Sequence, residues 1–345
     1  SDMAFWNPSE IIGNNPRPLD YSLYRAIITH RAWNRGIERI GYRRLEQDLM
    51  HRIGNKPYIC LEYSFYALIP QEVEEDLAIR LVRYYENALR HNLTAHDKIE
   101  FEIVFTTYDF GTEEKTGCLL SYGFTQEERK KLTDSLRRLT ERAVLDFDGI
   151  LKEDRQALKK LEAIRKEQEG LLKGKKATIH QTLSAVNRLL KSLQHYGTPQ
   201  FARQARMAFM ARAFLKSLTE HGPGGEGKPW FHQEEVDEFM QSITTVATQF
   251  ERDFRAFSQN EISRAEFNEK YGHLRVGTYD IRTERYDQMN FRPGPSKNQK
   301  KTEGRADALL GERLSQAIQK AGLHVEAAEL LHFIRQAIEQ REYFK

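Results

Sequence analysis

Residues 200–220 read QFARQARMAFMARAFLKSLTE, and they are the most informative segment for predicting the fold. Drawn as a helix, it carries apolar side chains almost all round, whereas a surface helix would keep them on one stripe. A segment of this kind has to be enclosed by other elements on every side. We therefore expect a central, buried helix around which the rest of the chain packs.

Helical spacing of apolar residues recurs on both sides of this segment. Apolar side chains at three- and four-residue steps predict a helix of about five turns over 21–40 and a second helix over 73–88. A further stripe runs from Val236 to Phe257. Two closing helices are expected from seams at Leu310, Leu314 and Ile318, and at Leu331, Ile334 and Ile338.

Two segments favour β-strands. Residues 57–69, PYICLEYSFYALI, are rich in β-branched and aromatic side chains and end at Pro70. Residues 99–107, IEFEIVFTT, alternate apolar and polar side chains, as a strand with one wet face does. We expect strands within 57–67 and 98–108 to share one small sheet. The expected fold class is α+β, predominantly α-helical, with a small β-sheet.

Charged residues concentrate at 126–176, where 15 basic and 11 acidic side chains surround a narrow apolar seam from Leu132 to Ile150. This pattern predicts a long charged helical hairpin on the surface. Acids interrupt the bases throughout, which favours a solvated face over a nucleic-acid surface. We expect three parts within one unit: 4–125 with the sheet, 126–176 as the hairpin, and 177–345 as a second helical part.

Composition excludes several classes of protein. The 345 residues have a formal net charge of +3, so net charge gives no reason to expect nucleic-acid binding. No stretch approaches the roughly 18 apolar residues that cross a bilayer, and we expect a cytoplasmic protein without a membrane partner. Cys60 and Cys118 are too few for a disulfide framework or a zinc cluster, and we expect no metal site.

The segment 222–228, GPGGEGK, matches the first seven positions of a phosphate-binding P-loop. A P-loop follows a strand, however, and this segment follows the expected central helix. Pro229 also occupies the position of the Ser or Thr that would bind magnesium. We therefore interpret 221–229 as a mobile surface loop.

The segment 270–287, KYGHLRVGTYDIRTERYD, holds most of the candidate chemistry. Ser263 and Glu266 form a plausible capping box for a short helix that ends near Lys270. The loop after it carries an imidazole, three guanidiniums and carboxylates, which is typical of a site for an anionic or strongly polar ligand. The alternative is that His273 and Asp280 only fix the turn, while the arginines pair with nearby acids.

Within this segment, YGHLRVGTYDI (271–281) resembles a signature of bacterial phosphoenolpyruvate-utilising, dikinase-like proteins of surface-polysaccharide operons, among them the glutamine kinases. WNPSEIIGNNPRPLDYSLYR (6–25) is similar to a segment that follows the ATP-grasp domain in the same proteins. Shorter similarities occur at 57–70, 196–211 and 333–345. Val276 departs from the pattern, because the family usually has Pro there.

The resemblance implies a three-part enzyme. An ATP-grasp domain phosphorylates a histidine on a swivelling domain, and the phosphohistidine then delivers the phosphoryl group to an acceptor. This chain resembles the middle part, which binds the acceptor in the related rifampin phosphotransferases. It lacks an ATP-grasp sequence and a phosphohistidine motif, so we expect it to be inactive alone and to need no cofactor, with ATP and magnesium used by the complete enzyme.

On this resemblance the acceptor is small and polar, either glutamine-like or saccharide-related. The implied catalytic residues are His273, Arg275 and Asp280. The implied substrate contacts are Tyr271, Tyr279, Arg282 and Arg285 in the loop, and Asn7, Glu10 and Ser22 in the N-terminal motif. The alternative function is a non-catalytic helical module that docks a protein partner through the charged hairpin.

Overall fold

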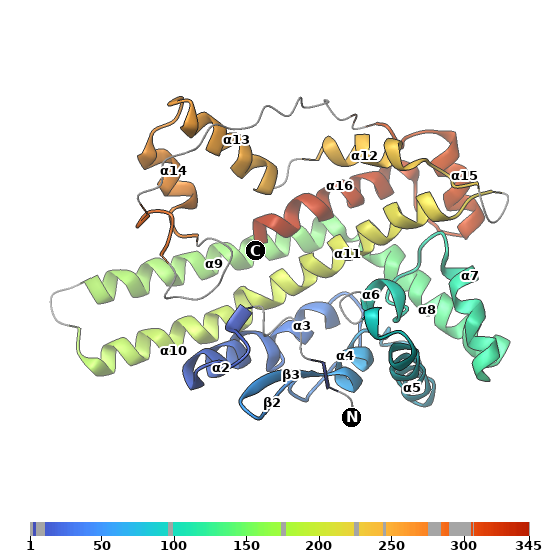
Figure 1. Cartoon of the computed structure of the whole chain (residues 1–345), viewed down its shortest axis with the longest axis horizontal. Coiled ribbons are helices and arrows are strands. Elements are labelled where there is room, and N and C mark those ends of the chain that lie inside the picture. Colours follow the sequence, from blue (N-terminus) through green and yellow to red (C-terminus); the bar gives the residue numbers. More distant parts are fainter. Residues whose placement is uncertain are drawn as a thin grey trace.

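The computed structural model describes residues 3–4, 11–95, 99–173, 177–223, 228–243, 246–274, 284–289, 305 and 307–344. These residues form a predominantly α-helical α+β protein with one small sheet, as the sequence predicts (Figure 1). No helix in this part of the chain is long and apolar enough to cross a membrane.

The predicted central helix is α11 (Thr198–Glu220), and it is buried along almost its whole length. It packs mainly against α16 (Ala327–Phe344) and α3 (Ala32–Glu38) (Figure 1). Gly36 permits the close contact with α11, because a Cβ there would lie 2.2 Å from the carbonyl oxygen of Pro199. Burying each large apolar side chain of α11 stabilises the fold by about 1.5–3 kcal/mol.

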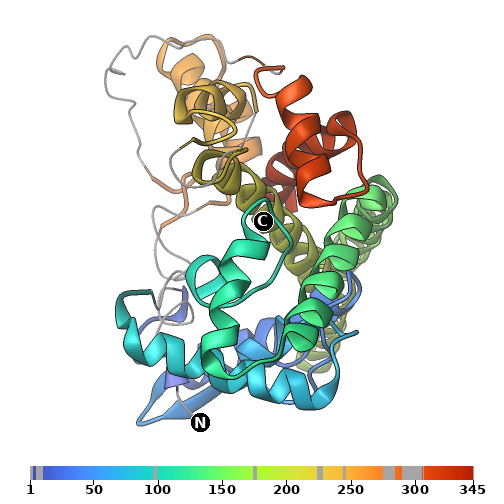
Figure 2. The same ribbon diagram turned by 90° about the vertical axis from the view of Figure 1, so that its right-hand side faces the viewer.

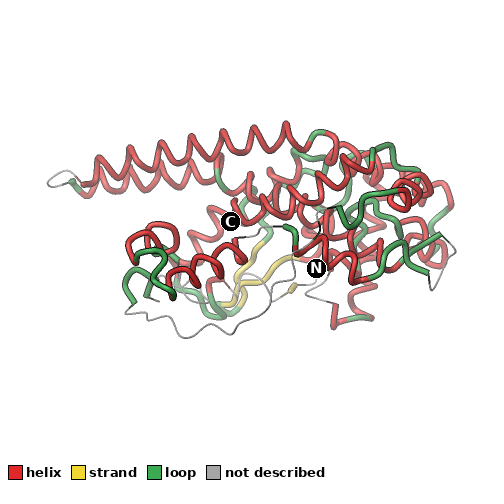
Figure 3. Tube along the Cα trace, turned by 90° about the horizontal axis from the view of Figure 1, so that it is seen from above, coloured by secondary structure: helices red, strands yellow, loops and turns green. Residues whose placement is uncertain are grey.

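The long surface hairpin is formed by α9 (Phe147–Lys173) and α10 (Ile179–Tyr196), which run side by side (Figures 1 and 3). The expected hairpin over 126–176 is therefore wrong in its boundaries. Its first half is α8 (Gln126–Leu145), whose seam residues Leu132, Leu136 and Leu139 are fully buried in the main core. Only the second half, α9, is an arm of the hairpin.

A buried ion pair fixes α9 to the central helix. The carboxylate of Asp154, on α9, is fully buried and accepts hydrogen bonds from the guanidinium of Arg203 and from the side-chain amide of Gln204, both on α11. Burial raises the pKa of Asp154, and the Arg203 guanidinium opposes that rise. Removing either partner would leave an uncompensated buried charge, so this pair holds the base of the hairpin in place.

The sheet differs from the expected one. Strands β1 (Met3–Ala4), β2 (Met50–Ile53) and β3 (Lys56–Cys60) are antiparallel in the order β1-β3-β2. Gly54 and Asn55 form the two-residue turn between β2 and β3 with positive φ angles of 54° and 65°, which suits a type I′ hairpin.

The expected strand over 57–69 holds only as far as Cys60, because α4 (Leu61–Ala67) follows at once. Its buried residues Leu61 and Phe65 are four positions apart, the spacing of a helix face. The expected strand over 98–108 is wrong, since the chain forms α6 (Ile99–Glu102) and then a segment without strand pairing. There the buried Ile99 and Ile103 are also four residues apart.

The expected helix over 21–40 is three consecutive elements: α2 (Pro18–Tyr24), a π-helical turn (Arg25–Thr29) and α3. Arg31 separates the π-helical turn from α3 with a left-handed φ of 66°, and the spacing of apolar residues does not predict this break. The expected helix over 73–88 is confirmed as α5 (Glu75–His91).

The remaining helices lie mostly toward the C-terminus. The stripe from Val236 to Phe257 is divided between α12 (Gln233–Gln241) and α13 (Val246–Ser258). The closing seams belong to α15 (Glu312–Ala321) and α16. Figure 2 shows α13 and α14 (Arg264–Tyr271) at the top of the molecule and the N-terminal sheet at its base. The short elements are 3-10 turns at Leu93–Ala95 and Thr116–Tyr122 and a helix, α7, at Thr112–Lys115.

Candidate functional site

The helix that leads into the candidate loop forms as the sequence predicts. The Ser263 hydroxyl accepts a hydrogen bond from the backbone N–H of Glu266, and the Glu266 carboxylate accepts one from the N–H of Ser263. This capping box begins α14, which ends at Tyr271. Gly272 then turns the chain in a place where a Cβ would lie 2.4 Å from the Asn268 carbonyl oxygen. The capping box therefore fixes the start of α14, and Gly272 fixes the point at which the loop leaves it.

An aromatic cluster between α13 and α14 packs against the described residues on either side of the loop. Tyr271 contacts Phe250, with ring centroids 4.9 Å apart, and Phe267, with centroids 5.0 Å apart. The Tyr286 ring packs on Phe250 from the far end of the loop, with centroids 5.8 Å apart. Phe254 and Phe257 complete the cluster through Phe267.

Tyr271 is anchored within this cluster. Its hydroxyl donates to the Asp253 carboxylate over 2.9 Å, and the Lys270 ammonium lies at the same distance from that oxygen. Desolvation raises the pKa of Tyr271 to about 12, and the hydrogen bond to Asp253 adds to the rise. Desolvation also acts to raise the pKa of Asp253, but the hydrogen bonds from Lys270 and Tyr271 outweigh it and hold the pKa below its usual value. Tyr271 is only 6% exposed, so the structure places this expected substrate contact in the support of the loop.

Two backbone hydrogen bonds close the loop at its base. The N–H of Tyr286 donates to the Leu274 carbonyl over 2.9 Å, and the N–H of Asp287 donates to the Gly272 carbonyl over 3.1 Å. The Arg285 guanidinium, beside this closure, pairs with the Asp287 carboxylate at 2.9 and 3.0 Å. These bonds join residues 272–274 to residues 285–287, the described residues on either side of the candidate loop.

His273 lies at that base with an exposed imidazole, and among the described residues no hydrogen bond or ion pair engages its ring. Ser22 is an exposed residue of α2, and its hydroxyl donates to the Pro18 carbonyl within the same helix over 2.7 Å. The other candidate residues lie outside the described residues: Arg275, Tyr279, Asp280 and Arg282 in the loop, and Asn7 and Glu10 near the N-terminus.

A second polar cluster, which the sequence did not indicate, directly follows the N-terminal motif. The carboxylate of Asp48 accepts hydrogen bonds from the guanidinium of Arg25, at 2.9 Å from Nε, and pairs with Nδ1 of His30. Desolvation acts to raise the pKa of Asp48, but the bonds from Arg25 and His30 prevail and lower it. His30 and Asp48 are 18 residues apart, so no local motif could announce the pair.

The structure bears on two further expectations. The Gly-rich segment follows α11, a helix, which supports the interpretation that it is no P-loop. The expected mobility of 221–229 stays a prediction, and residues 224–227 lie outside the described residues. Cys60 is buried and Cys118 exposed, both as free thiols. In the part of the chain that the structure covers, no three His, Cys, Asp or Glu side chains are grouped so as to hold a metal ion.

Comparison of the chain with family models, with curated proteins and with solved structures found no match. The resemblance to phosphoenolpyruvate-utilising proteins therefore stays a prediction from sequence motifs, chiefly those at 6–25 and 271–281.

Proposed function

We propose that this chain is the acceptor-binding domain of an ATP-dependent phosphotransferase that works through a phosphohistidine. The proposal rests on the position of His273 in the sequence and on the surroundings of its imidazole. It lies in the motif YGHLRVGTYDI, and its exposed imidazole has no polar partner among the described residues, while its neighbours Gly272 and Leu274 accept backbone hydrogen bonds.

The chemistry of phosphoryl transfer suits such a loop. The reaction needs positioning and neutralisation of charge more than covalent help from the protein. In the proposed role, the His273 imidazole takes the proton from the acceptor as the phosphoryl group arrives. Arg275 and Arg282 neutralise charge on that group, and Asp280 orients the imidazole or the acceptor.

The described surroundings of His273 suit this role. A general base must be held in place, and the two backbone hydrogen bonds beside His273 and the anchored Tyr271 supply that support. The structural alternative does hold for Arg285, which pairs with Asp287.

In this proposal the other parts of the reaction come from elsewhere in the complete enzyme. An ATP-grasp domain uses ATP and magnesium, and a swivelling domain carries the phosphohistidine. The acceptor is a small polar molecule, glutamine-like or saccharide-related.

Titration calorimetry on this chain with L-glutamine and with glucose 1-phosphate tests the binding role. One of the two is expected to bind, and His273→Ala should weaken that binding about tenfold or more, the loss of one hydrogen bond to a charged group. His332→Ala is the matched control, because this half-exposed imidazole pairs with Asp148 on another face. An equal effect of both variants would contradict the assignment of His273.

The alternative, a helical protein-interaction module, has one observation in its favour. Large apolar side chains are exposed toward the tip of the α9–α10 hairpin, with Ile179 81% and Leu183 64% exposed. This function predicts that Leu183→Asp abolishes a protein interaction, whereas the phosphotransferase function predicts normal acceptor binding by the same variant.

A further inference from the structure

A cavity of about 210 Å³ lies between the end of α11 and the end of α15, and the proposed function does not use it. Its walls come from three parts of the chain: α7 with the residues just before it, the end of α11 with described residues that follow it, Trp230 included, and the end of α15. The side chains that matter for its chemistry are Tyr108, Phe110, Glu114, Glu220, His221 and Trp230.

The described ends of the Gly-rich segment are fixed at the cavity. The N–H of Trp230 donates to the His221 carbonyl over 2.9 Å, which joins the two ends of the segment. Lys320, on α15, donates from Nζ to the carbonyls of Gly222 and Pro223, both at 3.0 Å. A Cβ on Gly222 would lie 1.5 Å from the Lys228 carbonyl oxygen, so only glycine allows the ends to approach so closely.

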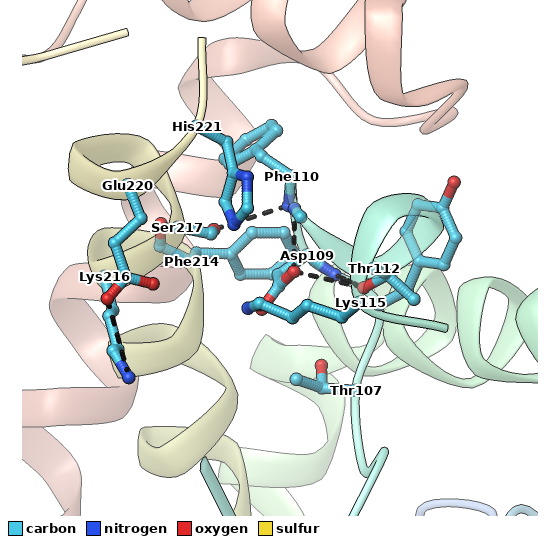
Figure 4. A network of polar contacts seen from close by, with 12 residues as sticks. Thr107, Asp109, Phe110, Thr112, Lys115, Phe214, Lys216, Ser217, Glu220 and His221 are labelled. Carbon is cyan, nitrogen blue, oxygen red and sulfur yellow. Dashed lines mark hydrogen bonds and ion pairs between the residues drawn. The ribbon is translucent and has the colours of Figure 1, made fainter. Parts of the chain in front are cut away.

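His221 forms a fixed wall of the cavity (Figure 4). Its Nδ1 lies 3.1 Å from the Glu114 carboxylate, and the side chain is only 17% exposed. The ring packs directly on Gly111, where a Cβ would lie 2.2 Å from Nε2. The imidazole is therefore held by a carboxylate on one side and by backbone on the other.

The charges around the cavity favour a cationic ligand. Four carboxylates line the cavity, against one lysine. Two of them have close cationic partners, Asp109 with Lys115 at 3.0 Å and Glu113 with Arg129 at 2.7 Å. Glu220, which is 43% exposed, forms a longer pair with Lys216 at 3.6 Å, and Glu114, which is 64% exposed, has His221 as its partner.

The one lysine that lines the cavity, Lys320, directs its ammonium to the two loop carbonyls. Trp230, Phe110 and Tyr108 add aromatic surface to the walls. Aromatic rings attract cations, and small-molecule sites combine aromatic walls with a few fixed polar groups.

We propose that this cavity binds a small organic cation, an ammonium group on a short apolar or aromatic body. The charge is recognised by Glu114 and Glu220, and the body packs against Trp230 and the neighbouring rings. This site is separate from the His273 loop, and its existence does not depend on the proposed function.

Titration calorimetry with three matched probes tests the proposal: phenethylammonium, the neutral 2-phenylethanol and the anionic 3-phenylpropionate. Phenethylammonium should bind about tenfold or more tightly than the alcohol, the gain expected from a cation beside aromatic rings and carboxylates. The anion should bind least.

Variants assign the binding to this cavity. Glu114→Gln combined with Glu220→Gln should weaken phenethylammonium binding about tenfold and leave 2-phenylethanol binding unchanged. Glu238→Gln, an exposed carboxylate of α12, is the control and should change nothing. Gly111→Ala should also weaken binding, because the new methyl group displaces His221. Equal binding of the ammonium and the alcohol, tighter binding of the anion, or no binding of any probe would each overturn the proposal.

Discussion

Two loops of this molecule begin in the same way, after a helix and beside a glycine, but their histidines have different surroundings. The Gly-rich segment leaves α11 at His221 and Gly222, and the candidate loop leaves α14 at Gly272 and His273. Backbone hydrogen bonds close each at its base. His221 is bound to Glu114 and packed on Gly111, whereas His273 is exposed without a polar partner among the described residues.

The difference between the two imidazoles comes from what faces them. In sequence both stand beside a glycine at the end of a helix, and nothing in that local pattern separates them. One has a carboxylate from a segment 107 residues away and so forms the wall of a cavity. The other is exposed and has no polar partner among the described residues, and the chemical role that we propose for it rests on this difference.

Of the substitutions that distinguish the two loops, Phe267→Ala should cause the largest loss of stability. Phe267 is 2% exposed at the centre of the aromatic cluster under the candidate loop. Its loss should lower the free energy of unfolding by about 3–5 kcal/mol, the usual cost of removing a buried phenylalanine. Denaturant unfolding measures the loss. Hydrogen exchange should show faster exchange at the N–H groups of Tyr286 and Asp287 and little change at Trp230, and equal acceleration of all three would contradict two independent loops.

Gly111→Ala should disturb the other loop instead. The new Cβ would lie 2.2 Å from His221 Nε2, so the ring has to leave its place. We expect destabilisation of about 1–3 kcal/mol, as for other overpacked positions, measured by denaturant unfolding. Acceptor binding through His273 should be unchanged, and its loss would show that the two loops are coupled.

A smaller, pH-dependent effect should come from Asp253→Asn. The pKa of Asp253 is lower in the folded protein than its usual value, so the ionised carboxylate stabilises the fold. This contribution is fully present above the ordinary carboxyl pKa of about 4 and is lost as the pH falls through the lower folded value.

Asp253→Asn should remove that part of the pH dependence and cost about 1 kcal/mol at pH 7, since the amide still accepts the Tyr271 hydroxyl but carries no charge. Thermal melts between pH 3 and pH 7 measure both effects. Parallel curves for the variant and the natural chain would contradict the role given to Asp253.

The sequence predicted those parts of the fold whose pattern is local. The all-round apolar character of 200–220 identified α11, and Ser263 with Glu266 identified the cap of α14. The expected strand over 98–108 is wrong because the spacing of Ile99 and Ile103 fits a strand and a helix equally well. Packing against the core, which the local sequence does not contain, selects the helix. The predicted boundaries of the hairpin are wrong because the apolar seam of α8 continues into α9 past Asp146, so the two helices look like one unit in the sequence. In the structure α8 faces the core, and the far half of α9 faces solvent.

The candidate site shows the same limit. Residues 270–287 could be chosen from sequence because their chemistry is concentrated in one segment. The anchoring of Tyr271 could not, since its partner Asp253 lies 18 residues earlier on another helix. The cavity at His221 joins three distant segments and leaves no local signal at all.

The role proposed for His273 is tested by measuring the two proposed half-reactions separately in the complete enzyme. With His273→Ala, ATP-dependent phosphorylation of the carrier histidine should proceed at the normal rate, while transfer to the acceptor slows by about 100- to 10,000-fold, the range for loss of a general base. His332→Ala should leave both steps unchanged. Equal loss of both half-reactions, with a lowered melting temperature for His273→Ala, would contradict the account and make the loop a structural element.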